Sequence, residues 1–107
     1  MFYIEKNKKN EFIFHLKSDD NHTIASSEPF VDLEQAKREI KRISKNTKVD
    51  RIFERMTNKE GLFYFNILGS NFQKTAESQL YNTKVGLENG IKAAKQFAKK
   101  TEIKISY

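Results

Sequence analysis

The 107-residue sequence contains no cysteine and only one proline. The absence of cysteine excludes a disulfide framework, thiolate metal ligands and a cysteine nucleophile. No segment approaches the roughly 18 consecutive apolar residues of a membrane helix, and Glu5 and Lys6 interrupt the apolar start that a signal peptide requires. We therefore expect a cytoplasmic protein that does not interact with membranes.

Positive charge exceeds negative charge by six, and most of the excess lies in the second half of the chain. Residues 1–50 hold ten Lys and Arg against nine Asp and Glu, whereas residues 51–107 hold ten against five. A basic half favours an anionic partner such as nucleic acid. Because the basic residues do not form a run of five or six, we prefer the alternative that they keep a small domain in solution.

The strongest feature of the sequence is an internal repeat with a spacing of 51 residues. Sliding the second half onto the first without a gap superposes identical residues at alternating aromatic positions and on one helix face. The identical pairs include Phe2 with Phe53, Phe12 with Phe63, Phe14 with Phe65, Ala25 with Ala76, Ser27 with Ser78 and Ile40 with Ile91. We interpret residues 2–50 and 51–107 as two repeat units of a single domain over residues 1–107.

Each unit has the pattern of three strands followed by a helix. In the first unit, alternation of apolar and polar residues predicts strands over residues 2–6, 11–17 and 23–26. Asp32 is suited to cap a helix whose apolar stripe comprises Leu33, Ala36, Ile40 and Ile43. In the second unit the helix is expected over residues 83–99, with Leu87, Ile91, Ala94 and Ala98 on its buried stripe.

A further strand is expected after each helix, over residues 49–55 and 102–106. The first of these is also the opening strand of the second unit, so no Gly/Ser/Pro linker separates the units. The sequence therefore predicts an α+β fold. In this fold, duplicated β-β-β-α-β units merge into one mainly antiparallel sheet with two helices packed on one face.

Three segments carry a resemblance to a known family. Residues 87–92 read Leu-Glu-Asn-Gly-Ile-Lys, residues 24–30 read Ile-Ala-Ser-Ser-Glu-Pro-Phe, and residues 12–17 read Phe-Ile-Phe-His-Leu-Lys. Together they resemble the small bacterial YegP-like proteins, which are tandem copies of a domain of unknown function. The resemblance covers essentially the whole chain. It implies the duplicated fold, with the strands after the helices exchanged between the halves, and it implies no known reaction, cofactor or catalytic residue.

The two histidines, His15 and His22, are the first candidates for a metal site. Strand alternation turns their imidazoles apart, and Asn66 and Gln73 stand at the equivalent positions of the second unit. We therefore interpret the histidines as polar surface residues and expect no metal site and no cofactor.

The serines at the end of the third strand of each unit are the candidates for a catalytic nucleophile. Ser26, Ser27 and Ser78 have no histidine at a defined spacing. We expect no catalytic residue and no enzyme, although an enzyme of unrecognised type stays open as a third alternative. It would require a pocket lined by convergent polar groups.

The sheet face opposite the helices is the candidate partner surface. Ile13, Tyr64 and Leu68 are expected to point away from the helices. Our leading hypothesis is a non-catalytic interaction module that binds a protein partner, or a second copy of itself, through this face. The alternative that these are ordinary scattered surface residues stays open.

Lysines recur at helical spacing on both predicted helices. Lys92, Lys95 and Lys99 form the candidate anion-binding set on the second helix, and Lys41, Lys45 and Lys48 have the same spacing on the first. The alternative function is weak, sequence-tolerant nucleic-acid binding through these lysines, with an affinity that falls with salt. A solvated helix face explains the same pattern, and we prefer that reading.

Overall fold

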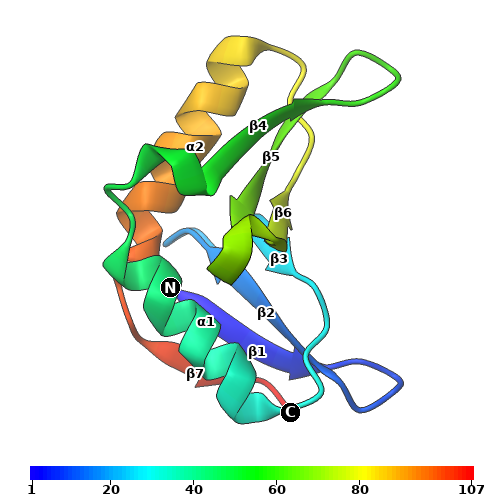
Figure 1. Cartoon of the computed structure of the whole chain (residues 1–107), viewed down its shortest axis with the longest axis vertical. Helices are drawn as coiled ribbons and strands as arrows, with labels where there is room; N and C mark the ends of the chain where they lie inside the picture. Colours follow the sequence, from blue (N-terminus) through cyan, green and yellow to red (C-terminus); the bar gives the residue numbers. More distant parts are fainter.

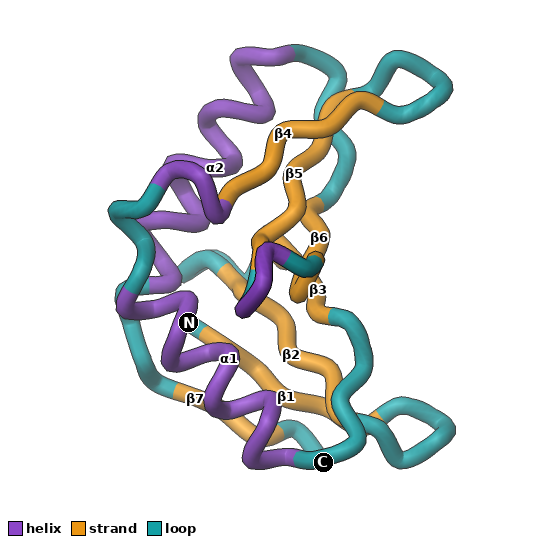
Figure 2. The backbone as a smooth tube through the Cα atoms, in the orientation of Figure 1, coloured by secondary structure: helices purple, strands orange, loops and turns teal.

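Seven strands form a single sheet in the order β4-β5-β6-β3-β2-β1-β7, and two helices cover one of its faces (Figure 1). The computed structural model describes all residues from 1 to 107. The strands are β1 (Phe2–Lys6), β2 (Phe12–Lys17), β3 (Thr23–Ser27), β4 (Phe53–Thr57), β5 (Phe63–Leu68), β6 (Lys74–Ser78) and β7 (Ile103–Ile105). The helices are α1 (Leu33–Lys45) and α2 (Lys84–Ala98), with 3-10 turns at Asp50–Ile52 and Ser70–Phe72 (Figure 2).

The two repeat units meet at the centre of the sheet, where β3 pairs antiparallel with β6 and Ser26 lies opposite Glu77. On either side of this pair the strand order is mirrored, with β2 and β1 beyond β3, and β5 and β4 beyond β6. An approximate twofold axis normal to the sheet therefore passes between β3 and β6. The predicted α+β fold with duplicated units merged into one mainly antiparallel sheet is confirmed.

The residues shared by the two units are those that face the helices. The side chains of Phe2, Phe14, Phe53 and Phe65 are at most 1 % exposed. Within the first unit the two rings meet edge-on at 5.6 Å between centroids, and within the second unit at 6.1 Å. Burial of each such ring contributes roughly 1.5–3 kcal/mol. The helices contribute the buried stripes that their spacing predicted, namely Ala36, Ile40, Ile43, Leu87, Ile91, Ala94 and Ala98.

The repeated serines have a structural role in both units. The Ser27 hydroxyl accepts a hydrogen bond from the backbone N–H of Phe14 at 2.8 Å and donates to the Glu28 carbonyl. Ser78 makes the same pair of bonds, accepting from the N–H of Phe65 at 2.9 Å. A buried backbone donor without a partner is costly, so both copies keep the hydroxyl for a strand N–H that lacks a backbone acceptor.

The segment after α1 differs from the prediction. Residues 50–52 form a 3-10 turn, and β4 begins only at Phe53, so the prediction of a strand from residue 49 was wrong for its first part. The Phe53 N–H bonds to the Asp50 carbonyl and closes the turn. The strand after α2 lies where the resemblance implied, because β7 pairs in parallel with β1 of the first unit.

Ion pairs fasten this turn to β4 and α2. The Arg55 guanidinium contacts Glu88 at 2.7 Å and Asp50 at 3.2 Å, and the Lys95 ammonium contacts Asp50 at 2.9 Å. The hydrogen bonds from Lys95 and Arg55 lower the pKa of Asp50, and the hydrogen bond from Arg55 lowers the pKa of Glu88. Both carboxylates are more than half exposed, so solvent screening keeps the contribution of each pair below about 1 kcal/mol.

The Asn-Gly-Ile segment of α2 is explained by packing. A Cβ atom at Gly90 would overlap the hydroxyl and ring of Tyr81, which lies against the helix at this point. The first unit has the pair Phe30 and Glu39 at the equivalent positions. There the Phe30 ring stacks on Phe14 with centroids 6.0 Å apart, which leaves room for a side chain at position 39.

We predict that Gly90→Ala lowers the free energy of unfolding by about 1–3 kcal/mol, because the added methyl group collides with Tyr81. Gly86→Ala is the matched control in the same helix, since its Cβ would meet nothing closer than 3.2 Å. That contact is with the Thr83 hydroxyl oxygen, which must move slightly, so Gly86→Ala should change stability by no more than about 1 kcal/mol in either direction. Urea denaturation measures both. Equal effects of the two variants, or no rescue of Gly90→Ala by Tyr81→Ala, would contradict this account of the motif.

Candidate functional site

One sheet face is left uncovered by the helices, and we call it the open face. A single row of side chains crosses it as direct cross-strand neighbours, one from each of the seven strands. In order from β4 to β7 this central row is Glu54, Asn66, Glu77, Ser26, His15, Tyr3 and Lys104. Every member can form a hydrogen bond. The row is acidic at its β4 end and basic at its β7 end.

His15 lies at the centre of the first-unit half of the row. Its Nδ1 atom is 2.7 Å from the Ser26 hydroxyl, and its Nε2 atom is 2.9 Å from the Glu5 carboxylate. Ser26 thus has a histidine partner in space, although no histidine stands at a defined sequence spacing from it. The register of β2 with β3 brings together residues 11 positions apart, which sequence spacing does not reveal.

A Glu–His–Ser chain is the arrangement that activates serine nucleophiles. Acyl transfer also requires hydrogen-bond donors where negative charge develops beside the nucleophile. The residue directly opposite Ser26 is Glu77, whose carboxylate is paired with the Lys74 ammonium at 3.1 Å. Glu5, His15 and Ser26 thus form a hydrogen-bonded chain on the sheet surface, with this ion pair beside it.

Tyr3 forms a basic aromatic patch at the β7 end of the row. The Lys17 ammonium lies 4.8 Å from the centroid of its ring, and the Lys104 ammonium lies 5.9 Å away. Such cation–π contacts contribute about 0.5–1 kcal/mol at exposed sites. The equivalent positions of the second unit are Glu54 and Leu68, so only the first unit has this patch.

Asn66 lies at the centre of the second-unit half of the row and is only 6 % exposed. Its Nδ2 atom donates to the Glu54 carboxylate at 3.0 Å, whereas its Oδ1 atom is buried without any hydrogen-bond partner. Exchanging the oxygen and nitrogen of the Asn66 amide would place two acceptors, the amide oxygen and the Glu54 carboxylate, against each other. The hydrogen bond to Glu54 therefore determines the orientation of the amide. An unpaired buried acceptor costs about 1–3 kcal/mol.

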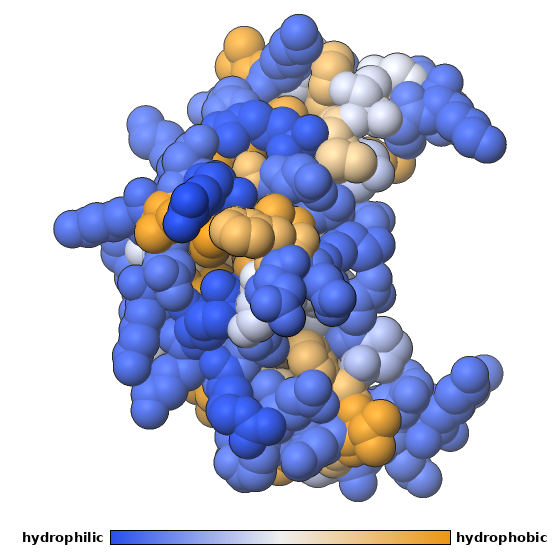
Figure 3. Space-filling view, viewed as in Figure 1, coloured by the Kyte–Doolittle hydropathy of each residue, from blue (hydrophilic) through white to orange (hydrophobic).

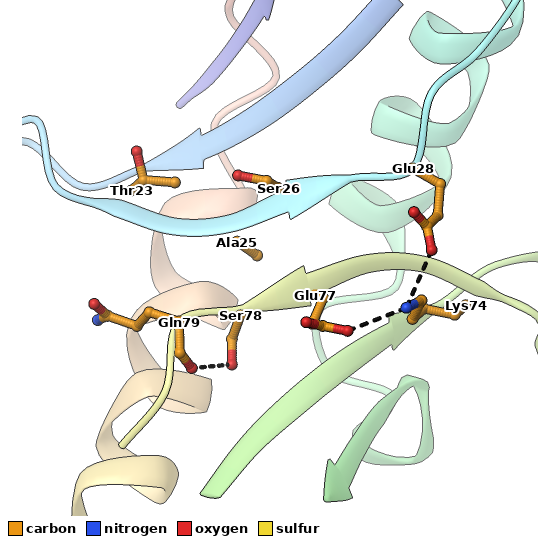
Figure 4. Close-up of a pocket in the computed structure, with 8 residues that line it drawn as sticks. All are labelled: Thr23, Ala25, Ser26, Glu28, Lys74, Glu77, Ser78 and Gln79. Atoms are coloured by element: carbon orange, nitrogen blue, oxygen red, sulfur yellow. Dashed lines mark hydrogen bonds and ion pairs between the residues drawn. The ribbon is translucent and has the colours of Figure 1, made fainter. Parts of the chain in front are cut away.

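A cleft of about 680 Å³ lies on the pseudo-twofold axis between β3 and β6 (Figure 4). In its wall the Lys74 ammonium bonds to Glu77 and to Glu28, each at 3.1 Å, so one ion-pair cluster joins the two units. These hydrogen bonds, to Glu77 first and then to Glu28, raise the pKa of Lys74. In the space-filling view the surface is hollowed and hydrophilic between the two hairpins that flank β3 and β6 (Figure 3).

The cleft is asymmetric although its position is symmetric. Residues related by the 51-residue spacing line both of its sides, and they differ in charge or size. The related pairs are Thr23 with Lys74, Ser26 with Glu77, and Glu28 with Gln79. The lining is almost wholly polar, which suits hydrogen-bonded contacts with a partner rather than enclosure of an apolar small molecule.

Of the predicted partner surface, Ile13 and Tyr64 lie on the open face as half-buried residues. The expectation that Leu68 is exposed there was wrong, because its side chain is only 8 % exposed. The register of β5 with β6 shifts between Ile67 and Leu68, just before the 3-10 turn Ser70–Phe72. The equivalent strand of the first unit has the same shift between Leu16 and Lys17, and Lys17 nevertheless lies beside Tyr3 on the open face. The shift alone therefore does not account for the burial of Leu68.

The predicted anion-binding lysines of α2 have different surroundings. Lys95 is bound to Asp50 and lies over the Phe53 ring, whereas Lys92 and Lys99 are exposed without an ion pair. The Ser44 hydroxyl donates to the Lys99 carbonyl at 3.3 Å, so the end of α1 adjoins the end of α2. Lys99 therefore lies beside the end of α1.

Charge is divided between the two layers of the fold. The helix layer, taken as residues 33–52 and 84–100 so that it includes the two helices, the 3-10 turn at 50–52 and the residues that join or follow them, holds twelve Lys and Arg against four Asp and Glu, a net charge of +8. The remaining residues hold eight against ten, a net charge of −2. The helix layer thus carries more than the whole excess of positive charge.

The structure contains neither a candidate metal-binding cluster nor a membrane-spanning helix. No group of three or more histidine and acidic residues is placed to hold a metal ion. Neither helix has both the length and the apolar character needed to cross a membrane.

We predict that Asn66→Leu raises the free energy of unfolding by about 1 kcal/mol, because it removes a buried acceptor that has no partner. His15→Leu is the matched control at the equivalent position, where both ring nitrogens are hydrogen-bonded. It should leave stability unchanged or lower it. Thermal and urea unfolding compare the two variants. A loss of stability in Asn66→Leu would show that the amide is satisfied in solution.

Comparison with known proteins agrees with this architecture. The model of a family described as a domain of unknown function, DUF1508, matches residues 7–54 and again residues 58–104. The UPF0339 protein YegP of Escherichia coli is 33% identical over 94 residues, covering 88% of this chain and 86% of its own length. A UPF0339 protein of Bordetella pertussis is 28% identical over 97 residues, covering 91% of this chain and 87% of its own length.

Two solution NMR structures have the same fold. That of YegP from E. coli superposes with a TM-score of 0.93 at 30% identity, covering 98% of this chain and 90% of its own. That of a UPF0339 protein from Shewanella oneidensis has a TM-score of 0.91 at 27% identity, covering 97% and 88% of the two chains. The protein belongs to the DUF1508 family of YegP-like UPF0339 proteins, whose function is unknown.

Proposed function

We propose that this protein is a non-catalytic interaction module that binds a protein partner through its open face. The observation that carries the proposal is the contrast between the two faces of the sheet. Most positions that face the helices are the same or similar in both units, with Ile4 and its equivalent Arg55 as the clear exception, whereas the central row has a different residue at every pair of equivalent positions. The fold therefore does not determine the residues of the open face, and the binding of a partner can determine them instead.

The open face combines apolar and polar groups in the manner of a binding surface. Ile13 lies opposite Glu5, and Tyr64 lies opposite Met56, beside the central row in each unit. Such half-buried side chains supply the apolar area that association buries, and the row supplies hydrogen-bonding groups that select a partner.

The charges at the two ends of the central row indicate how a partner is oriented. The acidic end, with Glu54 and Glu77, favours donors and positive charge, and the end with Lys17 and Lys104 favours negative charge.

Replacing both apolar residues in Ile13→Ser/Tyr64→Ser should weaken association by at least about tenfold while the fold is retained. Val85→Ser is the matched control, because Val85 is 70 % exposed on the helix layer. Light scattering over a range of concentrations measures self-association, and quantitative cross-linking in cell extract measures partner capture.

The proposal requires that the open-face variant alone loses the association. A wild-type protein that stays monomeric and forms no cross-linked complex would contradict it. So would a complex that Val85→Ser weakens as much as Ile13→Ser/Tyr64→Ser does.

A second candidate function is weak, sequence-tolerant nucleic-acid binding by the helix layer. The net charge of +8 on that layer supports it, as do the exposure of Lys92 and Lys99 and the placement of Lys99 beside the end of α1. Phosphate contacts made by lysines release counterions, so the affinity should fall steeply between about 50 mM and about 200 mM salt.

Lys41→Glu/Lys92→Glu/Lys99→Glu should abolish retardation of RNA and DNA in a gel at low salt. Lys8→Glu/Lys9→Glu/Lys59→Glu, which reverses three hairpin lysines, is a control of equal charge. If neither the wild-type protein nor the control retards any nucleic acid at low salt, this second function is excluded.

A further inference from the structure

The two outer edges of the sheet are equivalent by the pseudo-twofold axis, yet only one is covered. The outer edge of β1 is paired with β7, in the register Phe2 with Ile103 and Ile4 with Ile105. Its equivalent in the second unit is β4, which ends the sheet and has a neighbour only on the β5 side. In the first unit, β7 therefore shows the kind of segment that can pair with this edge, whereas the equivalent edge of β4 in the second unit is unpaired.

The end of the chain fills a defined place in the first unit. The Tyr107 ring lies 5.7 Å from the Phe12 ring, and the Lys6 ammonium lies 5.0 Å above Tyr107. Just before it, both the N–H and the hydroxyl of Ser106 donate to the Ile4 carbonyl, at 2.9 and 3.1 Å. Main-chain pairing and an aromatic contact together hold this segment on β1.

The equivalent place in the second unit is an open groove of about 350 Å³ between β4 and α2. Phe63 lies in it where Phe12 lies in the first unit, and Met56, Leu87 and Lys84 line it as well. Phe63 is half-buried, and Lys84 has no ion pair. The groove thus keeps the aromatic floor of the occupied site and places a cation beside it.

The backbone of β4 is also ready for a further strand beside the groove. The residue equivalent to Ile4 is Arg55. The Phe65 N–H opposite it bonds to the Ser78 hydroxyl, so the Arg55 carbonyl does not pair with β5 at this position. It faces the free edge as the Ile4 carbonyl faces β7. Two residues earlier, the edge of β4 cannot pair in the same way, because the Phe53 N–H already bonds to the Asp50 carbonyl.

We propose that the β4 edge and this groove bind an extended segment of a partner protein, added parallel to β4 from Arg55 onward, with an aromatic side chain on Phe63. The partner segment donates a backbone N–H to the Arg55 carbonyl, as Ser106 does to Ile4. It also carries a carboxylate near its aromatic residue, which pairs with Lys84. Strand addition of this kind takes affinity from the main chain and specificity from the pocket. The site shares only Met56 with the open face, and it does not depend on the function proposed for that face.

The test uses a synthetic peptide with the sequence of residues 101–107, Thr-Glu-Ile-Lys-Ile-Ser-Tyr, and the full-length protein labelled for NMR. We expect saturable shifts at Met56, Phe63 and Lys84 with a dissociation constant of about 1 mM or below. Replacing the peptide tyrosine by serine, or Phe63→Leu in the protein, should weaken binding about five- to tenfold. Phe12→Leu is the matched control at the occupied site and should leave the shifts at Phe63 unchanged.

Three results would overturn the proposal. The first is no shift at Phe63 at saturating peptide, and the second is shifts confined to β1 and β7, which would mean exchange with the chain's own strand. The third is a concentration-dependent dimer that Phe63→Leu abolishes, since it would assign the groove to a second copy of this chain. Shifts at Phe63 that respond to Phe63→Leu and to the tyrosine replacement, and not to Phe12→Leu, support it.

Discussion

The antiparallel pairing of β3 with β6 is the interaction on which the rest of the structure depends. A three-stranded unit with one helix is marginal by itself, because it buries few residues and leaves two strand edges free. Pairing β3 with β6 makes one continuous sheet, and α2 then packs across β2, β3 and β5, which come from both units. The strand after α2 returns to the first unit, so the core closes only when both units are present.

In this arrangement the two faces of the sheet meet different structural requirements. The face under the helices must fit the same aromatic and aliphatic core in both units, and there the copies retain Phe2 and Phe53, Phe14 and Phe65. The open face meets no such requirement. His15 and Asn66 occupy equivalent positions, yet one is fully hydrogen-bonded and the other has an unpaired oxygen. A duplication that preserves the core leaves the two halves of the open face free to acquire different binding groups.

The sequence predicted most of the fold because local periodicity encodes it. Alternation located β2 and β5, helical spacing located the buried stripes of α1 and α2, and the 51-residue spacing predicted that the units are equivalent. The 3-10 turn at Asp50–Ile52 was missed because the apolar residues around it fit a strand, and the ion pair of Asp50 with Lys95, 45 residues away, joins this turn to α2. No local pattern records such a partner.

The candidate site was harder to predict, since it depends on register. Whether His15 meets Ser26, or Asn66 lies between Glu54 and Glu77, is fixed by pairings between strands and by the bulges beside them. Leu68, which alternation predicted to be exposed, is buried, although its equivalent Lys17 follows the same bulge and lies on the open face. The groove beside β4 becomes visible only when the two halves of the sheet are compared in space.

The central claim is that the fold is independent of the residues on the open face. The most direct measurement is the free energy of unfolding, by urea denaturation, of a chain in which three first-unit residues are replaced by their second-unit equivalents. The variant is Tyr3→Glu/His15→Asn/Lys17→Leu. The account predicts a cooperative transition within about 1 kcal/mol of the wild-type protein. Loss of the cooperative transition, or destabilisation by more than about 3 kcal/mol, would show that these residues hold the fold together and would contradict the account.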